Sequence, residues 1–281
     1  MSIANLAKFY LRLGLPIVLL FTSACQEVDS RLEDREVTAS ARSNSPDLTE
    51  IEPVPTEDID RPKRQFPKVG NVVSESRNVS NFDRVRCSFG KLIVTQGDRE
   101  SLTVIAEDRL LDRIVSEVRD GTLYLYPKSN EPFVTFDRVQ FQLTVKNLNA
   151  LNLDGVVQVK AEQLKTDRLQ LGATGSAKID IESLDADTLQ VDLGGASELS
   201  LAGKVTDQTL TFSGGSRYYA DLLESQTVAL EINGAGKAAV WANDRLDVQI
   251  NGAGTVNFYG NPDVRQQIRG VGSIQPIGGF R

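Results

Sequence analysis

The residue types that usually carry catalysis are sparse in this chain. Its 281 residues include no histidine and two cysteines, Cys25 and Cys87. Serine, cysteine and metal mechanisms that need a histidine are therefore excluded, because the nucleophile would lack its usual base. Cys87 lies in an alternating stretch and is expected to be a small buried side chain. The sequence predicts no catalytic residue, no metal site and no cofactor.

Carboxylates are the remaining candidates for acid and base chemistry. Asp180 and Glu182 are two residues apart on an expected strand and so share a face, and Asp185 and Asp187 follow at the next bend. Paired carboxylates of this kind could cleave a polysaccharide. The equivalent positions of the neighbouring repeats carry other residues, namely Lys160, Glu162, Ser200 and Ala202. Solvated surface charges explain them more simply.

Aromatic residues suggest a binding surface instead. With Tyr219 and Val240 in the inward column, Tyr218, Trp241 and Tyr259 should point outward, and Trp241 and Tyr259 lie in one column of adjacent repeats. Such rings could stack on sugar or peptide, and Arg217 would suit the same site. Packing of these rings on each other, or under a corner, is the alternative.

A repeat of about 20 residues organises the region that holds these side chains. Segments that begin at Leu151, Leu171, Val191, Phe212, Ile232, Ile250 and Ile268 align in an apolar column. A glycine follows in each segment, at Gly155, Gly175, Gly195, Gly215, Gly236, Gly254 and Gly272. A fixed period of this length indicates stacked units, because one unit cannot bury its apolar face alone.

Each unit reads as two short strands joined by a bend. Residues such as Leu169 and Leu171 alternate with polar positions, and no unit has room for a helix. The corners are expected at Asn233, Gly236, Asn251 and Gly254, where Asn and Gly allow tight bends. Stacked Asn233 and Asn251 should share amide hydrogen bonds. The sequence thus predicts an all-β fold, a right-handed parallel β-helix-like solenoid, with antiparallel or irregular strands before residue 151.

Those earlier strands are expected at 85–89, 91–96, 102–106, 114–119, 122–126 and 139–145, with a helical turn near 108–112. Asp120-Gly121 between two alternating runs predicts a hairpin. The last repeat carries Arg265, Gln266, Gln267 and Arg269 in place of its apolar alternation. It is expected to act as a polar cap over the open end.

The N-terminus has the order of a secretory signal peptide over residues 1–24, with a basic start, an apolar core and small residues. The next residue, Cys25, resembles the acylated cysteine of bacterial lipoprotein signals. An ordinary signal peptide with an incidental cysteine is the alternative. The resemblance implies a protein exported and lipid-anchored to the cell envelope, and Gln26 favours the outer membrane.

Residues 25–68 are rich in proline and charge and poor in aromatic residues, which predicts a disordered linker. The folded domain is expected over 69–281. A formal charge of −7 is the wrong sign for a phosphate-backbone binder, so nucleic acid is not an expected partner.

Short phrases in the repeats resemble a known family. Ile232-Asn233-Gly234-Ala235-Gly236, Ile250-Asn251-Gly252-Ala253-Gly254 and Gly270-Val271-Gly272, with Asn81-Phe82-Asp83 and Gly121-Thr122-Leu123 further upstream, are similar to the "head GIN" family of putative auto-transporter adhesins, a domain of unknown function. The resemblance implies an exported β-helix-like domain and carries over no catalytic residues.

Two classes of function follow from these observations. The preferred one is a non-enzymatic envelope protein that binds glycan, protein or its own copies. The alternative is a lyase or hydrolase acting on polysaccharide, because β-helices also support such enzymes.

Overall fold

The computed structural model describes residues 70–128 and 138–278. The fold is nearly all-β, with 75% strand and 2% helix, and contains a β-solenoid of about six turns. This confirms the fold class that the repeats predict. The predicted signal peptide, Cys25 and the whole predicted linker, residues 1–68, lie outside the described residues. Within the described ranges, no helix has the length and apolar character to cross a membrane.

The N-terminal part of the domain consists of six strands and one short helix. They are β1 (Val72–Arg77), β2 (Arg84–Gln96), β3 (Ser101–Glu107), α2 (Asp108–Leu111), β4 (Ile114–Arg119), β5 (Thr122–Pro127) and β6 (Gln140–Val145). Strands β1, β3 and β6 pair antiparallel, as do β4 and β5. Strand β2 runs parallel to β5, β6 and β7, so the solenoid stacking already begins there.

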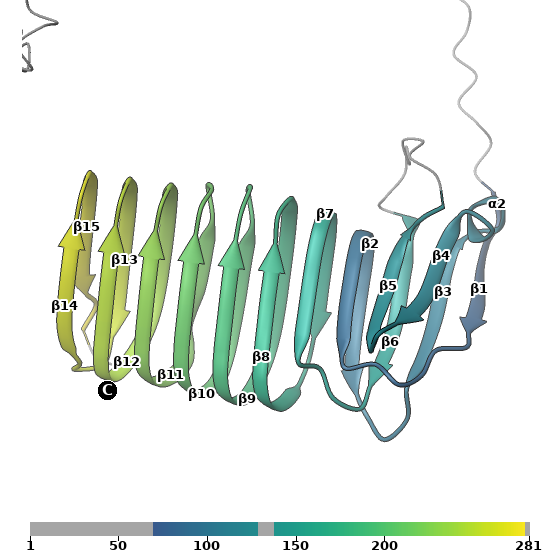
Figure 1. Cartoon of the computed structure of the whole chain (residues 1–281), viewed down its shortest axis with the longest axis horizontal. Coiled ribbons are helices and arrows are strands. Elements are labelled where there is room, and N and C mark those ends of the chain that lie inside the picture. The colour runs from purple at the N-terminus through teal and green to yellow at the C-terminus, as the bar shows by residue number, and fades with distance from the viewer. Residues whose placement is uncertain (1–69, 129–137, 279–281) are drawn as a thin grey trace, which may run out of the picture. The chain divides into compact units, whose positions relative to one another are not determined.

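The solenoid continues through nine strands to the last described coil. They are β7 (Ala150–Ala161), β8 (Leu164–Ala173), β9 (Ser176–Leu193), β10 (Glu198–Phe212), β11 (Arg217–Ile232), β12 (Ala235–Ile250), β13 (Ala253–Tyr259), β14 (Asp263–Ile268) and β15 (Val271–Pro276). Figure 1 shows the coils as two layers joined by turns at both edges. Layer 1 is defined here as the segments that lead into the glycine corner, and layer 2 as those that follow it.

Side chains from both layers meet in one continuous core. In layer 2 an inward column consists of Val159, Ile179, Leu199, Tyr218, Ala238 and Val256, all buried. In layer 1 the matching column consists of Leu151, Leu171, Val191, Leu210, Leu230 and Val248. Each buried Val, Leu or Ile contributes about 1.5–3 kcal/mol. The coils hold together because every one supplies such side chains to the same core.

One column of glycines forms the corner between the layers. It consists of Gly155, Gly175, Gly195, Gly214, Gly234, Gly252 and Gly270. From Gly175 onward, a Cβ on each would lie 2.1–2.7 Å from a carbonyl oxygen of the glycine one coil below. That oxygen accepts a hydrogen bond across the corner, as in the bond from the Ala253 amide to Gly234, 2.9 Å. Only glycine allows this close approach of stacked backbones.

The predicted corner glycines are partly wrong. Asn233 and Asn251 do lie at the bends, but Gly236 and Gly254 lie inside β12 and β13. They are buried, and a Cβ there would meet Ile232 or Ile250 rather than a carbonyl oxygen. Each of these coils has two nearby glycines, and only the first stacks on the backbone of the coil below.

The apolar alignment also shifts once. Val191 pairs with Leu210, whereas Phe212 pairs with Leu193 and Ile232. The apolar column expected from the sequence therefore combines residues from two neighbouring inward columns of the structure. A shift of two residues in the alignment leaves every side chain on the same face of its strand, so the apolar pattern does not reveal it. The amide hydrogen bond between the Asn columns is confirmed: Asn251 Nδ2 donates to Asn233 Oδ1 over 2.8 Å.

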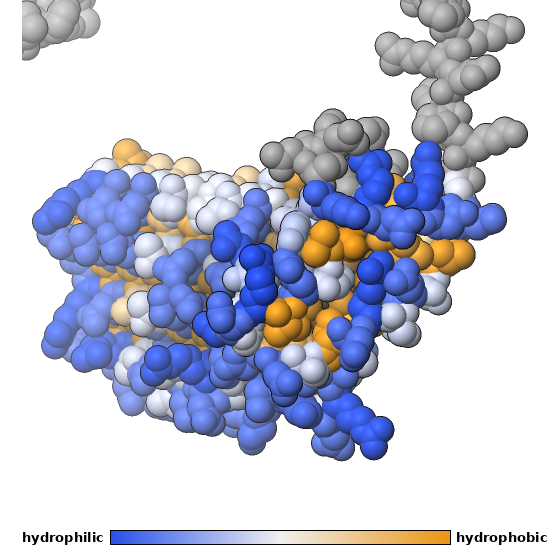
Figure 2. All heavy atoms as spheres, turned by 45° about the vertical axis from the view of Figure 1, so that its right-hand side comes forward, coloured by the Kyte–Doolittle hydropathy of each residue, from blue (hydrophilic) through white to orange (hydrophobic). Residues whose placement is uncertain are grey.

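The expected hairpin and helical turn are confirmed at the N-terminal end. Asp120 and Gly121 join β4 to β5 with φ of 48° and 71°, the two positive angles of a type I′ turn. In Figure 2 hydrophobic residues reach the surface near this end, where Val72 and Val73 of β1 are exposed.

A buried carboxylate fixes the chain around α2. Glu107 is fully buried and accepts hydrogen bonds from Arg138 Nη1 at 2.5 Å, Arg109 Nε at 2.7 Å and the Gly70 amide at 3.3 Å. These donors, Arg138 first, lower the pKa of the carboxyl group. A buried charge is tolerated when it is paired in this way, so Glu107 ties three separate segments together.

Cys87 is a core residue, as expected. It is fully buried in β2, and its Sγ lies 3.3 Å from the Phe89 carbonyl oxygen. Burial raises the pKa of the thiol to about 12. The thiolate is the reactive form, so this cysteine is unreactive in the folded protein.

The last described coil has the polar surface that the sequence predicts. Arg265, Gln266, Gln267 and Arg269 are exposed in β14 and just after it. Gln266 continues the layer 1 inward column beyond Val248. Val264 and Ile274 still pack against the core, so this coil is both part of the stack and polar at its surface.

Candidate ligand-binding platform

The aromatic and basic residues predicted as a platform come from layer 2 of β11, β12 and β13. Arg217 is exposed, and Trp241 and Tyr259 are half-buried. Trp241 and Tyr259 are register partners on adjacent coils, as expected. Tyr218 does not belong with them.

Tyr218 points into the core, which corrects the expected outward orientation. Its side chain is fully buried, whereas that of Tyr219 is 43% exposed. The stacking corner glycine is Gly214 rather than Gly215. An inward residue follows the stacking glycine by four positions, as Val159 follows Gly155 and Ile179 follows Gly175. Counted from Gly214, that position is Tyr218, so Tyr219 lies on the outward face together with Arg217.

A buried chain of hydrogen bonds accommodates the Tyr218 hydroxyl. It donates to Gln208 Oε1 at 2.7 Å, and Gln208 Nε2 donates to Ser225 Oγ at 2.5 Å. Ser225 Oγ in turn donates to the Trp241 carbonyl oxygen at 2.7 Å. Burial raises the pKa of Tyr218. These hydrogen bonds connect the core to the backbone of the corner that carries Trp241. Nothing in the sequence pattern indicates them.

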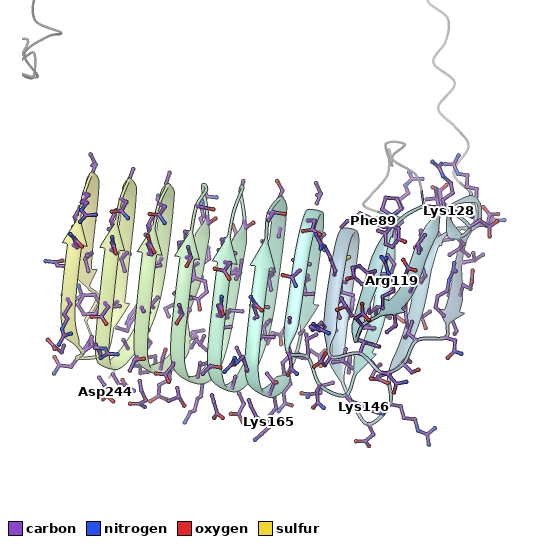
Figure 3. The ribbon with its side chains drawn as sticks, viewed as in Figure 1. Phe89, Arg119, Lys128, Lys146, Lys165 and Asp244 are labelled. Atoms are coloured by element: carbon purple, nitrogen blue, oxygen red, sulfur yellow. The ribbon has the colours of Figure 1, made fainter. Side chains whose placement is uncertain are left out.

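The indole of Trp241 is fixed at this corner by side chains. Its Nε1 donates to Asn243 Oδ1 at 3.0 Å, and Asn243 Nδ2 donates to Glu224 Oε1 at 3.1 Å. These two hydrogen bonds hold the ring in one orientation, as a contact surface requires. Figure 3 shows Asp244, the residue after Asn243, at the same edge of the solenoid as Lys165.

A bulge in β11 exposes a further apolar side chain nearby. Ala220 pairs with Val240 and Glu224 pairs with Trp241, so residues 221–223 have no partner in β12. Leu222 in this bulge is 60% exposed. A bulge re-aims side chains at a functional edge, and here it adds an aliphatic group next to the aromatic residues.

Two cations complete the platform. Arg217 and Lys237 are exposed register partners on adjacent coils, about 4.8 Å apart along the stack. Glu198 lies on the coil before Arg217, but its carboxylate is bound to Lys178 Nζ at 2.9 Å, which raises the pKa of Lys178. Among the described residues, neither Arg217 nor Lys237 has an ion-pair partner. Like charges placed opposite each other destabilise a sheet.

The carboxylates considered for catalysis have basic or hydroxyl-bearing neighbours on the adjacent coils. Asp180 has Lys160 and Ser200 as register partners. Asp185 binds Lys165 Nζ at 2.9 Å, which raises the pKa of Lys165. Over the described ranges, no group of three His, Cys, Asp or Glu residues could hold a metal ion. These side chains behave as surface charges.

Several solved structures have a similar fold. A putative adhesin from Bacteroides fragilis NCTC 9343 has a TM-score of 0.70 and 25% sequence identity, and the match covers 74% of this chain and 97% of that one. A putative lipid binding protein from Parabacteroides distasonis ATCC 8503 has a TM-score of 0.61 and 23% identity over the same shares. The second likeness shows the fold alone. Comparison with curated proteins gives no match.

The family comparison covers most of the described domain. The model described as "Putative auto-transporter adhesin, head GIN domain" matches residues 81–262, from the loop before β2 to the residue before β14. The family and these two neighbours are described as putative adhesins or a putative lipid binding protein and not as enzymes. The chain belongs to the head GIN domain family of putative auto-transporter adhesins.

Proposed function

We propose that this protein is an adhesin-like, non-enzymatic envelope protein that binds an acidic surface glycan through its layer 2 platform. The platform consists of Arg217, Tyr219, Lys237, Trp241 and Tyr259. The observation that carries the proposal is the exposed pair Arg217 and Lys237, two adjacent cations without a carboxylate partner in the described part of the chain. An anionic ligand would relieve their repulsion.

The neighbouring side chains favour a sugar polymer over a small anion. Tyr219 has Ser200 and Ala239 as register partners, so small side chains flank its exposed ring. Trp241 lies two residues beyond Ala239 on the same strand. Rings that are open on one face stack on the apolar face of a sugar, and the cations bind its carboxylates.

Binding to polygalacturonate, with its methyl ester as the uncharged control, tests this proposal. Affinity electrophoresis should show retardation by the acidic polymer that weakens with added salt. The Arg217→Ala/Lys237→Ala double variant should bind at least tenfold more weakly, and Tyr219→Ala should also lose binding. Lys160→Ala removes a cation from the same layer three coils away and should bind like the wild type.

Equal retardation by the ester, or unchanged binding of the double variant, would contradict the acidic-glycan assignment. Product analysis of the same polymers gives a second readout. Release of oligosaccharides would overturn the non-enzymatic assignment.

Membrane attachment through Cys25 is the second part of the proposal, supported by the lipoprotein-like signal before it. A lipid at Cys25 would hold the solenoid at the envelope, with residues 26–68 as spacer, and an outer-membrane location is the expected one. In detergent phase partitioning, the wild type should enter the detergent phase and Cys25→Ser the aqueous phase. Identical partitioning of the two would refute the anchor.

A further inference from the structure

Layer 1 carries a groove on the side of the core opposite the platform. It is an open groove of about 380 Å³ across four coils near the C-terminal end. Its lining comes from Thr209–Thr211, Ala229–Glu231, Asp247–Gln249 and Arg265–Gln267. Thr209, Ala229 and Asp247 are register partners on successive coils. The short methyl group of Ala229 therefore forms the floor of the groove between two longer side chains.

Two carboxylates in this groove are held by other side chains. Asn233 Nδ2 donates to Glu231 Oε1 at 2.9 Å, and Asn251 supports Asn233 from the next coil. Arg245 Nε binds Asp247 Oδ2 at 3.2 Å. Each carboxylate thus has one oxygen fixed, and its second oxygen has no partner among residues 70–128 and 138–278. Glu231 and Asp247 are diagonal neighbours on adjacent strands, a relation that places their Cα atoms about 7–8 Å apart.

The rest of the lining adds groups that donate as well as accept. Thr209 and Thr211 present hydroxyls, Gln249 and Gln267 present amides, and Arg265 presents a guanidinium. Amides and hydroxyls can each donate and accept. A ligand rich in hydroxyl groups is complementary to this mixture of donors and acceptors, because every hydroxyl group can also donate and accept a hydrogen bond.

Other ligand classes fit the groove less well. The carboxylates disfavour an anion, and two of them without a third ligand do not make a cation site. The groove lining contains no aromatic ring, and charged, amide and hydroxyl side chains stand among its apolar atoms, which disfavours a purely apolar ligand. From the oriented acceptors and the mixed lining, we infer that this groove binds a neutral saccharide, with Glu231 and Asp247 accepting hydrogen bonds from adjacent hydroxyl groups. The inference concerns a site separate from the platform.

Saturation-transfer NMR with neutral tetrasaccharides tests the inference on the full-length Cys25→Ser protein. The probes are the tetrasaccharides of β-linked glucose, α-linked glucose and β-linked mannose. At least one should show saturation transfer with the otherwise unchanged protein. Glu231→Ala and Asp247→Ala should each weaken its binding at least tenfold, and Asn233→Ala, which releases Glu231, should weaken it less.

Controls separate loss of the site from loss of the fold and from the platform. Gln170→Ala changes the same outward column two coils outside the groove and should leave binding unchanged. Arg217→Ala/Lys237→Ala should also leave it unchanged, so this test can fail while the platform stands. If Glu231→Ala melts at lower temperature, Glu231→Gln keeps the size but replaces one acceptor oxygen by an amide donor and removes the charge, and it should also weaken binding. No transfer to any probe, or equal losses for Glu231→Ala and Gln170→Ala, would overturn the inference.

Discussion

Replacing Gly214 by alanine should lower the free energy of unfolding by about 3 kcal/mol, whereas the same change at Gly215 should leave it within about 0.5 kcal/mol of the wild type. The two glycines are neighbours in one corner. A Cβ at Gly214 would lie 2.1 Å from the Gly195 carbonyl oxygen and 2.6 Å from its nitrogen, whereas a Cβ at Gly215 meets nothing within 4 Å. The added methyl group must push two stacked backbones apart.

The comparison isolates sterics, because both substitutions add the same methyl group and remove the same backbone freedom. The chain has one tryptophan, Trp241, so its fluorescence can follow unfolding in urea for all three proteins. For a domain of this size, 3 kcal/mol corresponds to a drop in melting temperature of roughly 6–12 °C. Equal stability of the two variants would show that the stacked corner tolerates a side chain.

The second large effect is expected inside the core. Gln208→Leu should cost about 1–3 kcal/mol, because the buried Tyr218 hydroxyl loses its acceptor, Gln208 Oε1, at 2.7 Å. The change also removes the Nε2 donor to Ser225 Oγ, which keeps its bond to the Trp241 carbonyl oxygen. Tyr218→Phe should cost a similar amount, since Gln208 Oε1 would then be buried without a donor. Each single change leaves one polar atom unsatisfied in the interior.

The double variant distinguishes a hydrogen-bonded pair from simple packing. Gln208→Leu/Tyr218→Phe removes both partners and should cost about 1–3 kcal/mol less than the sum of the two single changes. Urea unfolding of the four proteins gives the coupling energy. Additive single costs would mean that the hydroxyl and the amide do not stabilise each other.

The two proposed binding surfaces face away from each other across the core. The platform is built on layer 2 and the groove on layer 1, yet both use the same coils, β11 and β12. Each coil has two outward faces with independent side chains, because strand residues alternate between core and solvent. One solenoid could therefore present two different ligand surfaces from a single short stretch of sequence.

The sequence alone determines the class of fold and several of its parts. The period near 20 residues and the alternation of Leu169, Leu171 and their equivalents leave room only for stacked strands. Asp120-Gly121 defines its hairpin locally, because both residues accept positive φ. Cys87 is buried because its strand alternates. These features depend on residue types and their spacing along the chain, which the sequence displays directly.

The tertiary structure decides which residues occupy the site. Gly214 and Gly215 are equivalent in sequence, and only the carbonyl oxygen of Gly195 on the coil below selects Gly214 as the stacking residue. That selection turns Tyr218 into the core and Tyr219 outward. The polar chain from Tyr218 to Trp241 and the groove above Ala229 likewise join residues from different coils. Contacts between coils depend on the register in which the strands stack. A register shift of one residue moves every side chain to the opposite face of its strand, whereas a shift of two leaves the pattern of inward and outward residues unchanged.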